Sequence, residues 1–63
     1  MGMDAKEFKA LRAKSKLTQI DAGKLLGVTA RTIARWESGV VEIPALKGAG
    51  IRELIAEYRE ENR

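Results

Sequence analysis

With 63 residues, the chain is long enough for one domain only, near the lower limit at which a protein buries a core without disulfides or metals. It has no cysteine and no histidine, which removes disulfides, the usual zinc and iron ligands, thiol nucleophiles and imidazole bases. The net charge of +3 is uneven, because residues 1–16 carry +3, residues 17–39 carry +1 and residues 40–63 carry −1.

These properties narrow the classes of function. No nucleophile is paired with a base, so we expect no catalysis, no metal site and no cofactor. No apolar run approaches the length of a membrane span, and the amino terminus lacks the apolar segment of a secretory signal, so we expect a cytoplasmic protein without membrane association. A basic amino-terminal part, residues 1–39, followed by a nearly neutral tail is typical of a domain that binds a polyanion. We treat residues 1–63 as that single domain.

Helix starts and stops divide the first half of the chain. Asp4, followed by Glu7, is typical of a capped start, and it predicts a helix from residue 5 to about residue 15 with Phe8 and Leu11 on one face. Thr18 with Asp21 predicts a second start. The expected apolar stripe of this second helix, which ends at Gly27, consists of Ile20, Leu25 and Leu26.

A third helix and a helical tail follow. Thr29 is a suitable cap for a helix whose inner face carries Ile33 and Trp36 and whose end is marked by Ser38 and Gly39. Pro44 opens the tail, residues 44–61, because a helix start does not need the missing N–H. Its apolar stripe consists of Leu46, Ile51, Leu54, Ile55 and Tyr58. Since Gly48 and Gly50 leave open whether this tail is one helix or two, the sequence predicts an all-α bundle of four to five short helices.

The segment from about residue 18 to residue 39 has the pattern of a helix-turn-helix, in which two short helices are joined by a tight turn. A close crossing of such helices needs a small residue on the second helix, and Gly23 meets that need. Gly27 suits a turn that requires a positive backbone angle φ. Arg31 and Arg35 fall opposite Ile33 at 100° per residue, so both face solvent.

The same count places one cation and one anion close to the expected core. Glu37 falls about 40° from the core centre of the third helix, and Arg12 falls about 40° from Phe8 on the first helix. Burying either charge alone is costly. We therefore expect Arg12 and Glu37 to pair across these two helices.

The stretch LRAKSKLTQIDAGKLLGVTARTIARWESG resembles the lambda-repressor-like, Cro-type helix-turn-helix family of DNA-binding proteins. The resemblance covers residues 11–44 and rests on the Leu-Thr-Gln start, the Leu-Gly-Val turn and the aromatic-Glu-x-Gly close. It implies that Gln19 and Thr29 contact phosphates, that Ala30, Arg31 and Arg35 face bases, and that Arg12 pairs with Glu37. One departure is Gly23, where the family usually has alanine, and the tail is shorter than the family's usual two closing helices.

These observations predict a small transcriptional regulator, of repressor or antitoxin-like type, that binds double-stranded DNA sequence-specifically with a recognition helix at residues 29–38 in the major groove. The resemblance to the family also implies a homodimer on a two-fold operator. Further expected contacts to phosphates are Lys14, Lys16, Lys24 and Ser38.

Two alternatives stay open. The arginines and the lysines can simply be solvated cations on surface helices. Alternatively, the chain is a protein-interaction adaptor that keeps the fold without sequence-specific DNA binding and binds a protein through the third helix or the acidic tail. The acidic face of the tail can be an ordinary polar face or the surface for a protein partner that binds the carboxy-terminal helix. Its carboxylates are Glu53, Glu57, Glu60 and Glu61.

Overall fold

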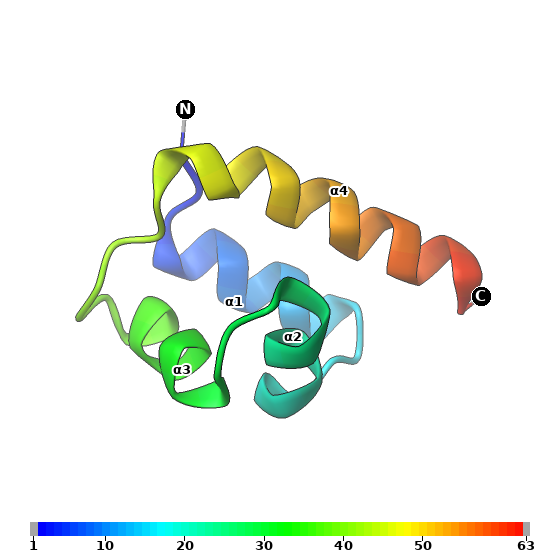
Figure 1. Cartoon of the computed structure of the whole chain (residues 1–63), viewed down its shortest axis with the longest axis horizontal. Helices are drawn as coiled ribbons and strands as arrows, with labels where there is room; N and C mark the ends of the chain where they lie inside the picture. Colours follow the sequence, from blue (N-terminus) through cyan, green and yellow to red (C-terminus); the bar gives the residue numbers. More distant parts are fainter. Residues whose placement is uncertain (1, 63) are drawn as a thin grey trace.

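The computed structural model describes residues 2–62, without the side chain of Leu46. In this range the chain is all-helical and contains no strand. The four helices are α1 (Ala5–Lys14), α2 (Gln19–Leu26), α3 (Ala30–Ser38) and α4 (Ala45–Glu61). Both α1 and α2 pack against α3, and α4 lies along one edge of the molecule in contact with α2 (Figure 1). The predicted all-α fold is confirmed, with four helices.

Three of the helices begin where their capping residues predict. The Asp4 carboxylate accepts a hydrogen bond from the backbone N–H of Glu7 at 2.7 Å, and Thr18 Oγ1 accepts one from the N–H of Asp21 at 3.0 Å. Thr29 Oγ1 does the same for the N–H of Thr32 at 3.1 Å. Each cap satisfies an N–H that the first helical turn leaves unpaired.

The same three helices end in one recurring motif, in which a residue of positive φ follows the last turn. The residues in this conformation are Lys16 (φ 60°), Gly27 (φ 74°) and Gly39 (φ 80°). In each case the next N–H reaches back five residues to a helical carbonyl, as from Leu17 to Arg12 at 3.2 Å. Glycine adopts this backbone freely, whereas a side chain at such a position is strained.

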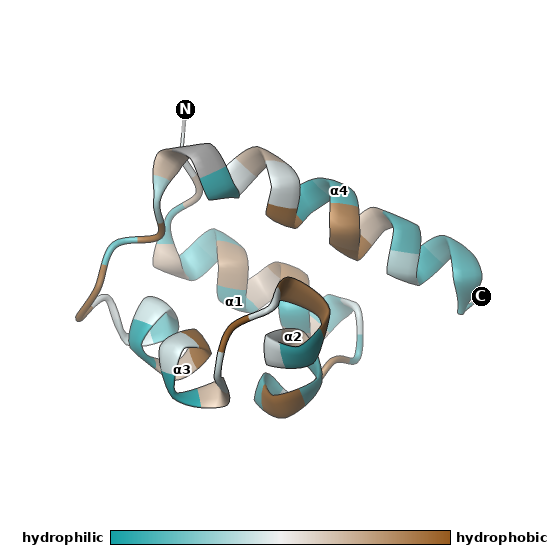
Figure 2. Cartoon of the chain, in the orientation of Figure 1, coloured by the Kyte–Doolittle hydropathy of each residue, from teal (hydrophilic) through white to brown (hydrophobic). Residues whose placement is uncertain are grey.

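A single apolar core lies between the helices. Phe8, Ile33 and Ile55 are completely buried, and the ring of Phe8 meets that of Trp36 edge to face with centroids 5.7 Å apart. Apolar segments of α2 and α4 lie where these helices approach one another, whereas the end of α4 is hydrophilic (Figure 2). Three helices and the tail thus share one core.

The expected apolar stripe of α2 is wrong at its first residue. Ile20 is 60% exposed, and the buried residues of α2 are Ala22 and Gly23, with Leu25 and Leu26 packed at the edge of the core. In a helix of two turns, the small side chains face α3, and Ile20 therefore points away from the core. On α4, Leu54 is also 39% exposed, at the edge of the stripe formed by Ile51, Ile55 and Tyr58.

Gly23 allows the turn between α2 and α3 to come very close. A Cβ atom at this position would lie 2.6 Å from the carbonyl oxygen of Val28 and 3.2 Å from the backbone N of Ala30. No real Cβ tolerates the shorter distance, so the backbone would have to move. The predicted need for a small residue here comes from the turn and the start of α3.

The tail forms one continuous helix, which settles the alternative that the sequence left open. A Cβ at Gly48 would lie 3.1 Å from the backbone N of Met3, because the amino-terminal segment crosses α4 at this glycine. Glu7 on α1 and Arg52 on α4 form an exposed ion pair at 2.7 Å. The predicted place of Leu46 in the apolar stripe lies outside the described side chains. No helix within residues 2–62 is long and apolar enough to cross a membrane.

Candidate nucleic-acid interface

The exposed side of α3 carries two arginines in adjacent turns. Ile33 and Trp36 are buried on one side of the helix, whereas Arg31, Arg35 and Ser38 are exposed on the other. Neither arginine forms an ion pair with any residue in the described range. The structure therefore presents two free guanidinium groups on one helical face, each able to donate paired hydrogen bonds.

The amino end of this helix carries groups that can attract an anion. Thr29 caps it, and unpaired backbone N–H groups and the positive end of the helix dipole lie there together with Arg31. A cation in the first turn is unfavourable in the isolated helix, and a bound phosphate removes that cost. Ala30, the first residue of α3, is half-buried and places no bulk between this end and a ligand.

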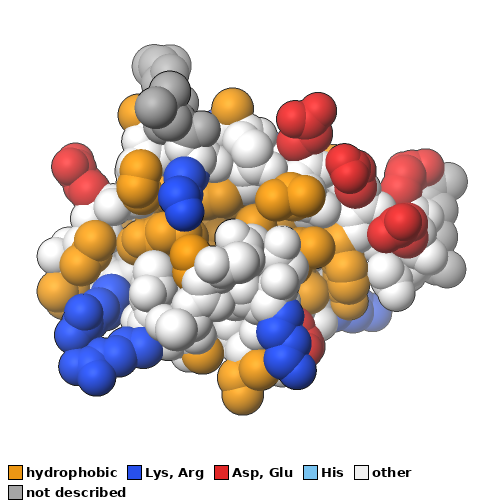
Figure 3. Space-filling model, in the orientation of Figure 1, with side chains coloured by type: hydrophobic (Ala, Val, Ile, Leu, Met, Phe, Trp, Pro, Cys, Tyr) orange, Lys and Arg blue, Asp and Glu red, His pale blue; other side chains and the backbone are white. Residues whose placement is uncertain are grey.

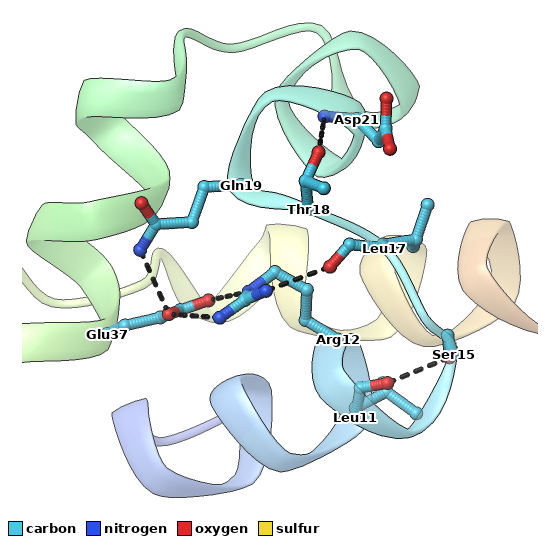
Figure 4. A network of polar contacts seen from close by, with 8 residues as sticks. All are labelled: Leu11, Arg12, Ser15, Leu17, Thr18, Gln19, Asp21 and Glu37. Atoms are coloured by element: carbon cyan, nitrogen blue, oxygen red, sulfur yellow. Dashed lines mark hydrogen bonds and ion pairs between the residues drawn. The ribbon is translucent and has the colours of Figure 1, made fainter.

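Arg12 and Glu37 lie in contact beneath α3 and tie α1 to it (Figure 4). The guanidinium donates to both carboxylate oxygens of Glu37, with Nη2 to Oε1 at 3.0 Å, and Nη1 donates to the carbonyl oxygen of Leu17 at 2.8 Å. The Glu37 side chain is only 5% exposed. A buried carboxylate in this position needs its partner, because an unpaired buried charge is costly.

The hydrogen bond to Glu37 raises the pKa of the Arg12 guanidinium above its ordinary value, and burial, which lowers this pKa, has the smaller effect. Arg12 consequently stays charged at physiological pH. The pair acts as a fixed brace between α1 and α3.

Gln19, the first residue of α2, joins the same network. Its Nε2 donates to Oε1 of Glu37 at 3.3 Å (Figure 4). The spacing of α2 contains a signal for this contact, because Gln19 stands four residues before Gly23 and shares its α3-facing side. One N–H of the Gln19 amide remains for a further acceptor such as a phosphate oxygen.

The basic side chains fall into two groups. In Figure 3 cations gather along the lower edge, over α2 and α3, whereas acidic groups follow the second half of α4. Lys24 is exposed in the last turn of α2. Lys14 and Lys16 instead lie at the corner between α1 and α2, away from α3 in Figure 1, and they border a shallow cleft with Tyr58 and Arg59.

Three features of this surface could not be predicted from the sequence. The Leu17 carbonyl as a third partner of Arg12 depends on the path of the corner, and Arg59 reaches the lysine cleft only because α4 runs back across the molecule. The hydroxyl of Ser38 donates to the Arg35 carbonyl at 3.1 Å. Among the described residues no group of three His, Cys, Asp or Glu side chains is placed to hold a metal ion.

Comparison with protein families shows which family the chain belongs to. The family model of the helix-turn-helix, of Cro/C1 or lambda-repressor-like type, matches residues 8–47. The chain belongs to this helix-turn-helix family. Members of the family are DNA-binding regulators, and the match spans most of α1, all of α2 and α3, and the start of α4. Comparisons of this helix-turn-helix protein with curated proteins and with solved structures give no significant match.

Proposed function

We propose that this helix-turn-helix protein is a transcriptional regulator that reads a specific sequence of double-stranded DNA with α3 in the major groove. The observation that carries the proposal is the pair of exposed, unpaired guanidinium groups of Arg31 and Arg35 on the side of α3 opposite its core face. Each can donate two hydrogen bonds to O6 and N7 of a guanine, which is worth about 1 to 3 kcal/mol of discrimination. Ala30, at the start of the same helix, faces a base edge and leaves room for it.

The remaining contacts in the proposal hold the DNA backbone. Thr29 and Gln19 stand at the amino ends of α3 and α2, where helix dipoles favour phosphates. The lysines contribute sequence-independent attraction, and the hydroxyl of Ser38 donates to a phosphate oxygen in place of its bond to the Arg35 carbonyl. Lys24 lies on the same helix-turn-helix unit, and Lys14 and Lys16 reach phosphates that flank it. Loss of one such lysine lowers affinity on all sequences and reduces the salt slope of binding by about one.

In the proposal the protein acts as a repressor or an antitoxin-like autoregulator, as a homodimer on two half-sites. Occupying the operator is the simplest mode of action for a helix-turn-helix unit, since it needs only the DNA contacts already proposed.

Selection of bound duplexes from a randomised pool, followed by sequencing, tests this function. We expect an enriched motif containing guanine and a binding constant that falls steeply as salt rises, because phosphate contacts release counterions. The adaptor alternative, for which the acidic α4 face is the best candidate surface, predicts little DNA affinity at any salt concentration. A pool that shows no enrichment contradicts sequence-specific binding.

A further inference from the structure

A pocket that opens to solvent lies where three segments of the chain meet. Its walls are residues 2–5 of the amino-terminal segment, the end of α3 and residues 41–45, which lead into α4. The amino-terminal segment and the loop from α3 to α4 run side by side there, at the left of Figure 1. Its volume is about 620 Å³. Sites for small ligands range from about 300 to 1,000 Å³, so this amino-terminal pocket has the size of one.

The floor of the amino-terminal pocket is apolar because it is the edge of the core. Met3 and Trp36 are 4% exposed and Ile43 is 7% exposed, and all three line the pocket. Val41, which also lines it, is 43% exposed. An apolar group that enters the pocket removes this surface from water, which is favourable.

Two carboxylates, those of Asp4 and Glu42, line the same pocket, and both side chains are exposed. Among the described lining residues there is no lysine or arginine. Neither carboxylate forms an ion pair within residues 2–62. Asp4 accepts the N–H of Glu7 with Oδ1 alone, so its other oxygen is left for a ligand. The pocket thus carries two negative charges that the described chain does not pair.

The two helix starts at the pocket do not cancel this charge. Ala5 begins α1 and Ala45 begins α4, and both residues line the pocket. Each helix start carries about half a positive charge, so the two contribute about one against two carboxylates. The balance is negative, and a cation is therefore favoured over an anion.

We propose that the amino-terminal pocket binds a small amphipathic cation, namely a primary amine attached to an aromatic or branched aliphatic group. The apolar group packs on the floor formed by Trp36 and Ile43, and the carboxylates of Asp4 and Glu42 attract the ammonium group. Neither Arg31 nor Arg35 lines the pocket, so this site goes beyond the proposed function and does not depend on it.

Titration of the whole chain with 2-phenylethylamine, in the absence of DNA, tests the proposal. Trp36 is the only tryptophan of the chain and lines the pocket, so its fluorescence reports binding. We expect saturation with a Kd on the order of 1 mM, because the ligand is small and the pocket is open. 2-Phenylethanol, which has the same ring without the charge, should bind about 10-fold more weakly. The anion 3-phenylpropionate should bind more weakly still.

Two variants remove the negative charges and keep the size of the side chains. Asp4→Asn retains a good cap for α1, since asparagine caps helices as well as aspartate does. Asp4→Asn and Glu42→Gln should each weaken binding of the amine by about threefold, and the double variant should weaken it by about 10-fold. Binding of 2-phenylethanol should stay unchanged in all of them. Glu57→Gln, which removes an exposed carboxylate of α4 outside the pocket, is the matched control and should leave amine binding unchanged.

Amide chemical shifts locate the ligand, because Trp36 also borders a groove with Leu26 and Leu54. Changes at Met3 and Ile43 support the amino-terminal pocket, whereas changes confined to Leu26 and Leu54 overturn the proposal.

The variants should stay folded, which circular dichroism verifies. Equal affinities for the amine and the alcohol, undiminished amine binding by the double variant, or no binding of the amine at 10 mM, about 10 times the expected Kd, also overturn the proposal. Since the titration contains no DNA, a failure of the proposed function leaves its outcome unaffected.

Discussion

Lys16 has the positive φ that Gly27 and Gly39 adopt after the other two short helices. Its Cβ makes this conformation cost about 1 to 2 kcal/mol relative to glycine. A residue kept in an unfavourable conformation points to a use for its side chain, and Lys16 is exposed at the corner where we propose a phosphate contact. Fold and function thus make opposite demands at this position.

Lys16→Gly should raise the free energy of unfolding by about 1 kcal/mol, because it removes the strain without touching the core. Urea denaturation measures the change. Lys16→Ala is the matched control, since it removes the same charge but keeps a Cβ, and it should give little gain. Equal stabilities of the two variants would show that the strain is absent.

The ion pair between Arg12 and Glu37 beneath α3 should contribute strongly to the stability of the fold. Removing one partner with Arg12→Met or Glu37→Gln should destabilise the chain by about 3 kcal/mol or more, because the other group stays buried. The double variant should lose less than the two single losses combined, with a coupling of at least about 1 kcal/mol. Denaturation of all four proteins in a stabilising osmolyte measures this, and additive losses exclude the coupling.

At the scale of elements, the helix starts could be predicted because capping is local. Asp4, Thr18 and Thr29 bind an N–H three residues away, so neighbouring sequence decides them. The exposure of Ile20 could not be predicted, since α2 has apolar residues on more than one side and its packing against α3 selects the buried one. The use of Gly48 could not be predicted either, because it lies in a tertiary contact, where the amino-terminal segment packs directly against α4.

At the candidate interface, too, local features could be predicted from the sequence and the geometry of contacts between helices could not. The outward direction of Arg31 and Arg35 follows from the helical period once Ile33 is taken as core. The contact between Gln19 and Glu37 joins residues 18 apart, and its geometry depends on how α2 crosses α3. Periodicity within one helix therefore finds exposed faces and buried charges that need a partner, such as Arg12 and Glu37, whereas the geometry of the contact between Gln19 and Glu37 needs the fold.

Substitution by alanine should have opposite effects on stability at two helical glycines, Gly50 and Gly23. Gly50→Ala should raise the free energy of unfolding of the monomer by about 1 kcal/mol, because nothing opposes the added methyl group. Gly23→Ala should lower it despite the same gain in helix propensity, because the added Cβ would meet the Val28 carbonyl oxygen at 2.6 Å. Thermal unfolding at low protein concentration compares them, and a stabilising Gly23→Ala contradicts the tight turn.

In the whole molecule, basic and acidic side chains lie on opposite edges. Arg12 and Glu37 pair beneath α3, Arg31 and Arg35 face outward from it, and the carboxylates of α4 lie on the other edge (Figure 3). With a basic edge on one side and an acidic edge on the other, the protein turns its basic edge toward a polyanion. Attraction to phosphates alone gives no sequence specificity, which needs contacts to bases. We propose that the arginines of α3 supply the specificity.

Fluorescence anisotropy on the selected duplex and on a scrambled duplex tests that claim most directly. The variants are Arg31→Ala/Arg35→Ala and Lys6→Ala/Lys9→Ala, which remove equal charge from exposed positions of α3 and α1. We predict that the arginine variant loses at least about 30-fold of its preference for the selected duplex, as two base contacts of about 1 kcal/mol each require, and that the lysine variant keeps this preference. Equal loss of preference in both variants would contradict the assignment of α3 as the recognition helix.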